Sequence, residues 1–113
     1  MSKPRNFFYY RIIPGDMELR LKGVSRNAEL ILHRLMRVYF TRDREIPATP
    51  AKIANLVGFT EAEIQDEWED LAELIDIAGS EVRIPWFDAE VEDAKRRSER
   101  GRTAANGRWG GAA

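Results

Sequence analysis

The chain has 113 residues, of which 43% are hydrophobic and 10% aromatic, a composition that excludes wholesale disorder and allows one modest core. It contains no cysteine, which excludes disulfides and thiolate zinc sites and fits a reducing cytoplasm. The N-terminal residues lack the apolar run of a signal peptide, and no segment approaches the ~20 apolar residues of a membrane span, so we expect a cytoplasmic protein without a membrane partner.

The charges are segregated along the chain, although the net charge is only −1. Residues 1–55 hold eleven Lys/Arg against five Asp/Glu, residues 56–94 hold one Arg against thirteen acids, and residues 95–113 hold six Lys/Arg against one acid. This basic–acidic–basic order predicts separate electrostatic surfaces.

The N-terminal segment 6–16, "NFFYYRIIPGD", is aromatic and β-branched and ends in Pro-Gly. It predicts a strand or extended arm laid over the core and closed by a turn. In an alternative interpretation its rings stack on nucleic-acid bases beside Lys3, Arg5 and Arg11.

A long helix is predicted over residues 26–42, with Ser25 as its N-cap. Apolar side chains recur at helical spacing and form its buried stripe: Ala28, Ile31, Leu32, Leu35 and Tyr39. The opposite side carries Arg26, Arg34 and Arg37 with His33, the one histidine of the chain, so no metal site can be completed by histidine.

Two further helices are predicted from local capping signals. After the extended piece "EIPATP", Thr49 caps a short helix that has Pro50 at its first position and ends at Gly58. Thr60 and Glu63 then form a capping box that opens a helix over 60–74. This helix buries Ile64, Trp68, Leu71 and Ile75 and leaves its seven acids exposed.

The C-terminal third is predicted to hold a hairpin, a helix and a flexible tail. Two alternating runs flank Gly79-Ser80, a pattern typical of a β-hairpin. Asp88 is the expected cap of a helix whose acids come first and whose bases come last. The Gly-rich end, "GRTAANGRWGGAA", lacks periodicity and is expected to be flexible.

The order of these elements is that of a winged helix-turn-helix, a mainly α fold with a small β-hairpin (α+β), and a generic helical domain is the alternative interpretation. We expect a domain over 1–94, with an N-terminal aromatic arm or strand, followed by the basic end of the last helix and the tail over 95–113. The expected core includes Ile31, Leu35, Ile53, Leu56, Ile64, Trp68, Leu71, Ile84 and Trp86.

Catalysis is not expected from these residues. The carboxylates lie on a solvated helix face, whereas catalytic pairs need an environment that separates their pKa values. The sequence holds no nucleophile–histidine constellation, and its glycines do not have the spacing of a phosphate-binding loop. We therefore predict neither an enzyme nor a bound cofactor or metal.

The chain resembles a family of phage and prophage domains of unknown function that stand at the N-terminus of replication-associated proteins. The likeness lies in Gly15-Asp16 after an aromatic N-terminus, in Ser25 opening "AELILHRLMRVYF", in "IPATPAKIANLVGFTEAEI", in Trp68 and the hairpin, and above all in the ending "KRRSERGRTAANGRWGG". The resemblance implies a winged-helix fold and a role near replication initiation in a bacterial host cell, of the replisome-organiser or helicase-loader type. Many members continue through a linker into a further domain.

The first functional hypothesis is DNA binding, to single or double strands, through the basic flanks. The residues expected to contact phosphates are Lys3, Arg5, Arg11, Lys95, Arg96, Arg97, Arg100, Arg102 and Arg108, and Trp109 is expected to stack. Sequence specificity would be weak, because few side chains are held rigidly enough to distinguish base edges. A solvated linker is the alternative interpretation of the tail.

The second hypothesis is a protein-interaction or self-assembly module. Its acidic helix would contact a replication protein or another copy of the chain through Glu63, Asp66, Glu67, Asp70 and Glu73. A small phage transcriptional regulator is the third hypothesis, but the segment 60–74 offers only Gln65 as a good base-reading side chain.

Overall fold

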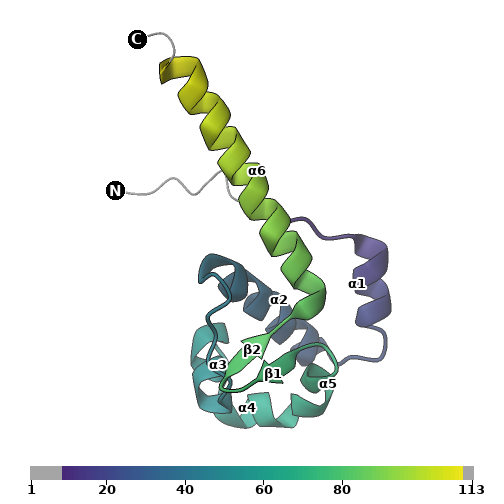
Figure 1. Ribbon diagram of the computed structural model, residues 1–113. Helices are drawn as coiled ribbons and strands as arrows, with labels where there is room; N and C mark the ends of the chain where they lie inside the picture. The colour runs from purple at the N-terminus through teal and green to yellow at the C-terminus, as the bar shows by residue number, and fades with distance from the viewer. Residues whose placement is uncertain (1–8, 111–113) are drawn as a thin grey trace. The chain divides into compact units, whose positions relative to one another are not determined.

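The computed structural model describes the backbone of residues 9–110 and the side chains of residues 9–101 (Figure 1). This part of the chain is mainly helical with a small two-stranded antiparallel sheet, the α+β class that the sequence predicts. The chain divides into two compact units, Ile13–Phe87 and the combination of Met1–Ile12 with Asp88–Ala113.

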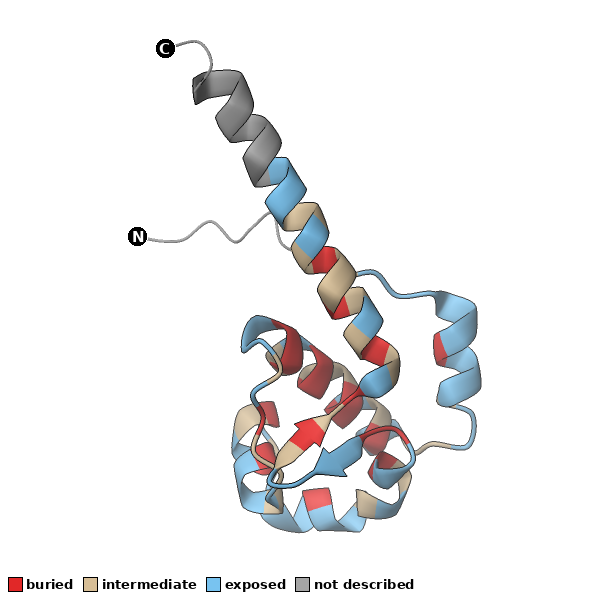
Figure 2. Ribbon diagram, in the orientation of Figure 1, coloured by how far each residue is buried: buried red, intermediate tan, exposed pale blue. Residues whose placement is uncertain are grey.

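The first helix, α1 (Pro14–Arg20), lies where the sequence predicts an arm and a turn. Residues 9–13, the described part of that arm, form no strand, so of the two predicted alternatives the strand is wrong there and the arm is left. The expected Pro-Gly turn is wrong, because Pro14 and Gly15 begin a helix. Proline fixes the φ angle that the first helical position needs, and Asp16 in the first turn complements the helix dipole. Only Met17 of α1 is buried (Figure 2).

The central helix, α2 (Arg26–Thr41), has the predicted cap and the predicted buried stripe. The Ser25 hydroxyl accepts a hydrogen bond of 3.1 Å from the Ala28 amide, which satisfies one of the free N–H groups at the helix start. Its apolar face is buried at Ala28, Ile31, Leu32, Leu35, Met36, Tyr39 and Phe40.

The next two helices, α3 (Pro50–Val57) and α4 (Glu61–Asp66), begin at the residues that the capping signals predict. Thr49 caps α3, and Gly58 ends it in a left-handed conformation with φ 76°. Thr60 and Glu63 form the capping box of α4. The Arg34 side chain from α2 donates a hydrogen bond of 2.7 Å to the Val57 carbonyl at the end of α3, so it holds the α3–α4 turn and does not lie free on the outer side of α2.

The predicted continuous helix over 60–74 is broken at Glu67, whose φ of −98° and ψ of 5° leave the helical region. The second piece is α5 (Trp68–Ala72). The Glu67 amide is shared between the carbonyls of Glu63 and Ile64, each at 3.2 Å, and such sharing is common at helix ends. Helix propensity gives only a weak signal for this break, because Asp66 and Trp68 on its two sides are poorer helix formers than Gln65 and Glu69 beyond them.

The hairpin consists of β1 (Asp76–Ala78) and β2 (Glu81–Arg83), joined at Gly79 with φ 65°. In the antiparallel register Ile77 faces Val82. The extended piece before α3 lies along the other edge of β2, because the Val82 amide donates to the Ile46 carbonyl at 2.9 Å and Pro47 forms a bridge with Glu81.

The last helix, α6 (Pro85–Gly110), begins earlier and ends later than predicted. Asp88 therefore lies in its first turn and is not its cap. Residues 101–110 continue the helix, so the expectation of a flexible tail is wrong for them. An existing helix is extended without a new nucleation cost, and arginine and alanine favour extension between the unfavourable glycines.

Most of the predicted core is confirmed. Full burial is found for Ile31, Leu35, Ile53, Ile64, Leu71 and Ile84. Half-burial is found for Leu56, Trp68 and Trp86. Trp86 keeps its indole N–H at the surface of the core, where it donates 2.7 Å to the Leu74 carbonyl and lies under the Arg20 guanidinium at 4.5 Å.

Candidate nucleic-acid interface

The basic residues predicted to contact phosphates fall into three groups. Lys3 and Arg5 lie outside the described residues. The backbone of α6 includes Arg102, Arg108 and Trp109, but the structure does not describe their side chains. Those that can be placed are Arg11, Lys95, Arg96, Arg97 and Arg100.

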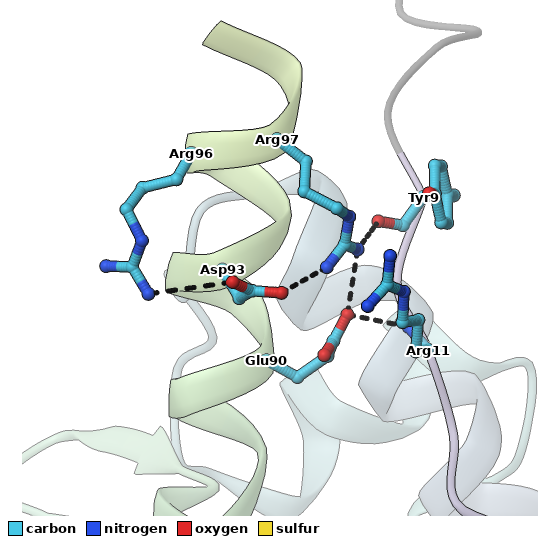
Figure 3. Close-up of polar contacts among 6 residues, drawn as sticks. All are labelled: Tyr9, Arg11, Glu90, Asp93, Arg96 and Arg97. Carbon is cyan, nitrogen blue, oxygen red and sulfur yellow. Dashed lines mark hydrogen bonds and ion pairs between the residues drawn. The ribbon is translucent and has the colours of Figure 1, made fainter. Parts of the chain in front are cut away.

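Arg97 is drawn into a network of internal contacts (Figure 3). Its side chain is only 13% exposed. Its Nη2 donates 2.9 Å to Glu90 Oε2 and 3.0 Å to the Tyr9 carbonyl, and its Nη1 pairs with Asp93. The guanidinium also lies 4.7 Å from the centre of the Tyr9 ring, within the range of a cation–π contact.

This network fastens residues 9–11 to α6. The Arg11 amide donates 2.7 Å to the same Glu90 oxygen that Arg97 contacts. The hydrogen bond to Glu90 is the main cause that raises the pKa of Arg97 above its ordinary value, so the residue stays charged. Its Nη1 and Nη2 groups are occupied, and its Nε is buried without a hydrogen-bond partner in the described part of the chain. Arg97 is therefore better described as the anchor of residues 9–11 than as a free phosphate ligand.

The neighbouring bases on α6 are more accessible. Arg96 is 60% exposed and pairs loosely with Asp93 at 3.7 Å. An exposed pair of this kind contributes about 0–1 kcal/mol, so a phosphate can replace the carboxylate at little cost. Arg100 is exposed and has no hydrogen bond or ion pair within the described part of the chain. Lys95 is half-buried and has an interaction partner.

Two acids of the predicted partner-binding set are used inside the fold. Asp70 Oδ2 accepts a hydrogen bond of 3.0 Å from the Ser25 amide, and Glu67 Oε1 accepts one from the Ser25 hydroxyl. Both carboxylates are half-buried, so the expectation that they are exposed is wrong. Their negative charges lie at the start of α2, where the helix dipole favours them.

The remaining acids of the set keep the predicted exposure. Glu63 Oε1 accepts 2.8 Å from the Thr60 amide in the capping box. Asp66 and Glu73 have no hydrogen bond or ion pair through their side chains among the described residues. Gln65, the one candidate for reading bases, is exposed and donates 3.4 Å to Glu61.

The sequence did not reveal the bonds of Ser25 to Glu67 and Asp70, nor the contacts of Glu90 and Arg34. Each joins residues that are far apart along the chain, and no local pattern marks them. A weak signal existed for Arg34, because it lies three residues after the buried Ile31, close to one helical turn, and so near the edge of the stripe.

Comparison of the chain with protein-family models, with curated proteins and with solved structures gave no match. Within the described residues, no helix is both long enough and apolar enough to cross a membrane. No three metal-ligating side chains in that part of the chain are grouped closely enough to hold an ion.

Proposed function

We propose that the chain is a winged-helix nucleic-acid-binding protein that contacts DNA through the basic part of α6, with weak sequence specificity. The observation that carries this proposal is that the buried part of α6 ends where its run of basic residues begins. Ala94 is the last buried residue of α6 in the described part, and the run of bases begins at Lys95. A charged helix that leaves its core in this way presents its bases to solvent and to phosphates.

The length of this segment suits a duplex. From residue 95 to residue 110 the helix extends about 24 Å, at about 1.5 Å per residue. A rigid helix also restricts where the bases lie, which reduces the entropy that a flexible tail would lose on binding. The proposal of a phosphate contact is therefore stronger for a helix than for the flexible tail that the sequence predicts.

The order of elements supports the winged-helix part of the proposal. A helix is followed by an extended piece that pairs with β2, then by two helices around Gly58, then by the hairpin. In the proposed winged helix the recognition helix would be the acidic segment α4–α5, so base reading in the usual manner is not proposed. The resemblance to phage replication-associated domains would place this activity at replication initiation.

A salt titration with labelled duplex DNA tests the proposal. If Lys95, Arg96, Arg100, Arg102 and Arg108 all contact phosphates, log K falls against log[salt] with a slope of up to about −4.5, at roughly −0.9 per contact. Arg96→Gln with Arg100→Gln should flatten that slope by up to about 1.8. Glu99→Gln, an exposed charge of opposite sign on the same helix, serves as the control and should not flatten it.

An unchanged slope in the Arg96–Arg100 variant would refute the proposed contact. Substitution is preferable to deletion of residues 95–113, because deletion also removes Arg97 and with it the anchor of residues 9–11. Weaker binding after deletion would therefore have two explanations.

The second candidate function, a protein-interaction module, is favoured by one observation. Asp66, Glu69 and Glu73 remain exposed after Glu67 and Asp70 have been used internally. Sedimentation of the full chain at low and high salt tests this function, since an assembly held by these acids would dissociate as salt rises.

A further inference from the structure

The outer face of α2 carries basic side chains that no internal contact explains. Arg26, Leu30, His33 and Arg37 follow one another at i, i+4, i+7 and i+11, so they share one face of the helix. This face is opposite the buried stripe. Arg26 and Arg37 are exposed, and Leu30 between them is 42% exposed.

The two arginines are unoccupied, in contrast to Arg34 on the same helix. Arg34 is half-buried, bonds to Val57 and lies 5.3 Å from the centre of the Phe59 ring. Among the described residues, neither Arg26 nor Arg37 has a hydrogen bond, an ion pair or a ring contact through its side chain. The fold therefore uses one arginine of α2 and leaves two of them free on the outer face.

We propose that this face, defined by Arg26, Leu30, His33 and Arg37, is a second DNA-contact surface that binds the phosphate backbone of a duplex. The proposal rests on the proposed function and adds a contact that belongs to the unit Ile13–Phe87, independent of α6.

The spacing of the two arginines fits a duplex groove. Arg26 and Arg37 stand three helical turns apart, about 16 Å along the axis. The major groove is about 12 Å wide, so two guanidinium groups at this separation can contact phosphates on its two sides. Leu30 lies between them and faces the groove without a charge to be desolvated.

A second copy of the chain is the competing occupant, because the exposed acids of α4 and α5 complement the same face. The magnitudes favour DNA. Exposed ion pairs between proteins contribute about 0–1 kcal/mol each and are screened by salt. A phosphate contact also releases condensed counterions, which gives DNA binding its large entropic gain.

The experiment compares salt titrations of the full chain with a mixed-sequence duplex. Arg26→Gln with Arg37→Gln should flatten the slope by up to about 1.8, at roughly 0.9 for each arginine that no longer neutralises a phosphate. Lys22→Gln with Lys52→Gln is the charge-matched control, since both lysines are exposed, lie outside α2 and have no side-chain partner in the described residues. This control should change the slope by less than half as much.

The other outcomes overturn the proposal in distinguishable ways. Equal effects of the two variants would mean that only net charge matters and that α2 makes no contact. If the Arg96–Arg100 variant weakens binding and the Arg26–Arg37 variant does not, the proposed function stands and the second surface is refuted. If the Arg26–Arg37 variant alters sedimentation and not the DNA slope, a second copy occupies the face. If the unaltered chain binds no duplex, both proposals fall.

Discussion

The backbone amide of Ser25 donates a hydrogen bond of 3.0 Å to the carboxylate of Asp70, across 45 residues of chain. The Ser25 hydroxyl donates to Glu67 and at the same time accepts from the Ala28 amide. One serine therefore starts α2 and attaches it to α5. The acidic segment therefore has two parts. Glu67 and Asp70 bind Ser25 inside the fold, a set of contacts called here the Ser25 clasp, and its other acids form an exposed surface.

The clasp predicts that Asp70→Asn lowers stability. Hydrogen bonds to charged groups contribute about 1.5–3 kcal/mol, and the half-burial of Asp70 places the expected loss near the lower limit, at about 1–2 kcal/mol. Asp66→Asn is the matched control, because Asp66 is exposed and without a partner in the described residues, and it should change stability by less than about 0.5 kcal/mol. Urea unfolding measures both, and equal midpoints would contradict the clasp.

The half-burial of Trp68 changes the expected cost of its removal. Leu71 is fully buried, so Leu71→Ala should cost about 2–5 kcal/mol. Trp68 is only half-buried, so Trp68→Ala should cost about 1–2 kcal/mol, below the roughly 3–5 kcal/mol usual for a buried tryptophan. Thermal unfolding gives the order of the two variants, and a larger loss for Trp68→Ala would show that the indole packs more tightly than its exposure indicates.

The features that the sequence predicted well are those encoded within four residues. Ser25, Thr49 and the Thr60–Glu63 box each satisfy amides two or three positions ahead, and Gly58 is required by its own left-handed φ. The buried stripe of α2 follows from helical spacing alone. Both kinds of signal are local, so one sequence is sufficient to find them.

The features that the sequence missed depend on partners far along the chain. Arg97 reaches the Tyr9 carbonyl across 88 residues, and Ser25 reaches Glu67 across 42. Within a run of like charges, the local sequence does not show which residue has a partner inside the fold and which is solvated. For this reason the sequence pattern groups Arg97 with the phosphate ligands, and Asp70 with the partner-binding acids.

Gly58 is predicted to be the least replaceable of the turn glycines. Its φ is 76°, and an added Cβ would lie 3.2 Å from the Arg34 Nη1 that bonds to Val57. Gly58→Ala should therefore cost the left-handed strain of about 1–2 kcal/mol and weaken the Arg34 contact as well. Gly79→Ala, at φ 65° with open space around it, isolates the strain alone. Denaturant unfolding should show a greater loss of stability for Gly58→Ala than for Gly79→Ala. The reverse order would mean that the Arg34 contact does not stabilise the α3–α4 turn.

Tyr9 is predicted to report on the contacts that hold residues 9–11. Its phenol has a lowered pKa, first because of a hydrogen bond with the Arg11 side chain and then because of the positive charge of Arg97. Arg11→Gln should raise this pKa toward its ordinary value of 10.0, as followed by the Tyr9 ring resonances in an NMR titration. Arg100→Gln should leave it unchanged, and identical titrations of the two variants would contradict the contact.

The direction of the Tyr9 pKa shift determines the pH range in which the phenol contributes to stability. A lowered pKa favours the tyrosinate in the folded state. The stabilisation is complete above the unfolded-state pKa and is lost as the pH falls through the folded-state pKa. Below the folded-state pKa, the bond from Arg97 to the Tyr9 carbonyl and the bond from the Arg11 amide to Glu90 hold residues 9–11 without help from the phenol.

The last prediction concerns the acids that remain exposed. Asp66→Asn with Glu73→Gln removes two negative charges without touching the clasp at Ser25. If DNA binds through bases of α6 and of the outer face of α2, and not through α4 and α5, these acids make no phosphate contact, and screening over about 8 Å at roughly 0.15 M salt weakens their longer-range repulsion. We therefore expect an affinity for duplex DNA within about twofold of the unaltered chain at that salt, which is less than the tenfold that about 1.4 kcal/mol would produce. A large gain in affinity would mean that α4 and α5 face the duplex, and it would contradict both proposed surfaces.

Sedimentation of the same variant tests the protein-interaction function. If the variant loses a salt-sensitive assembly that the unaltered chain forms, these acids contact a basic partner.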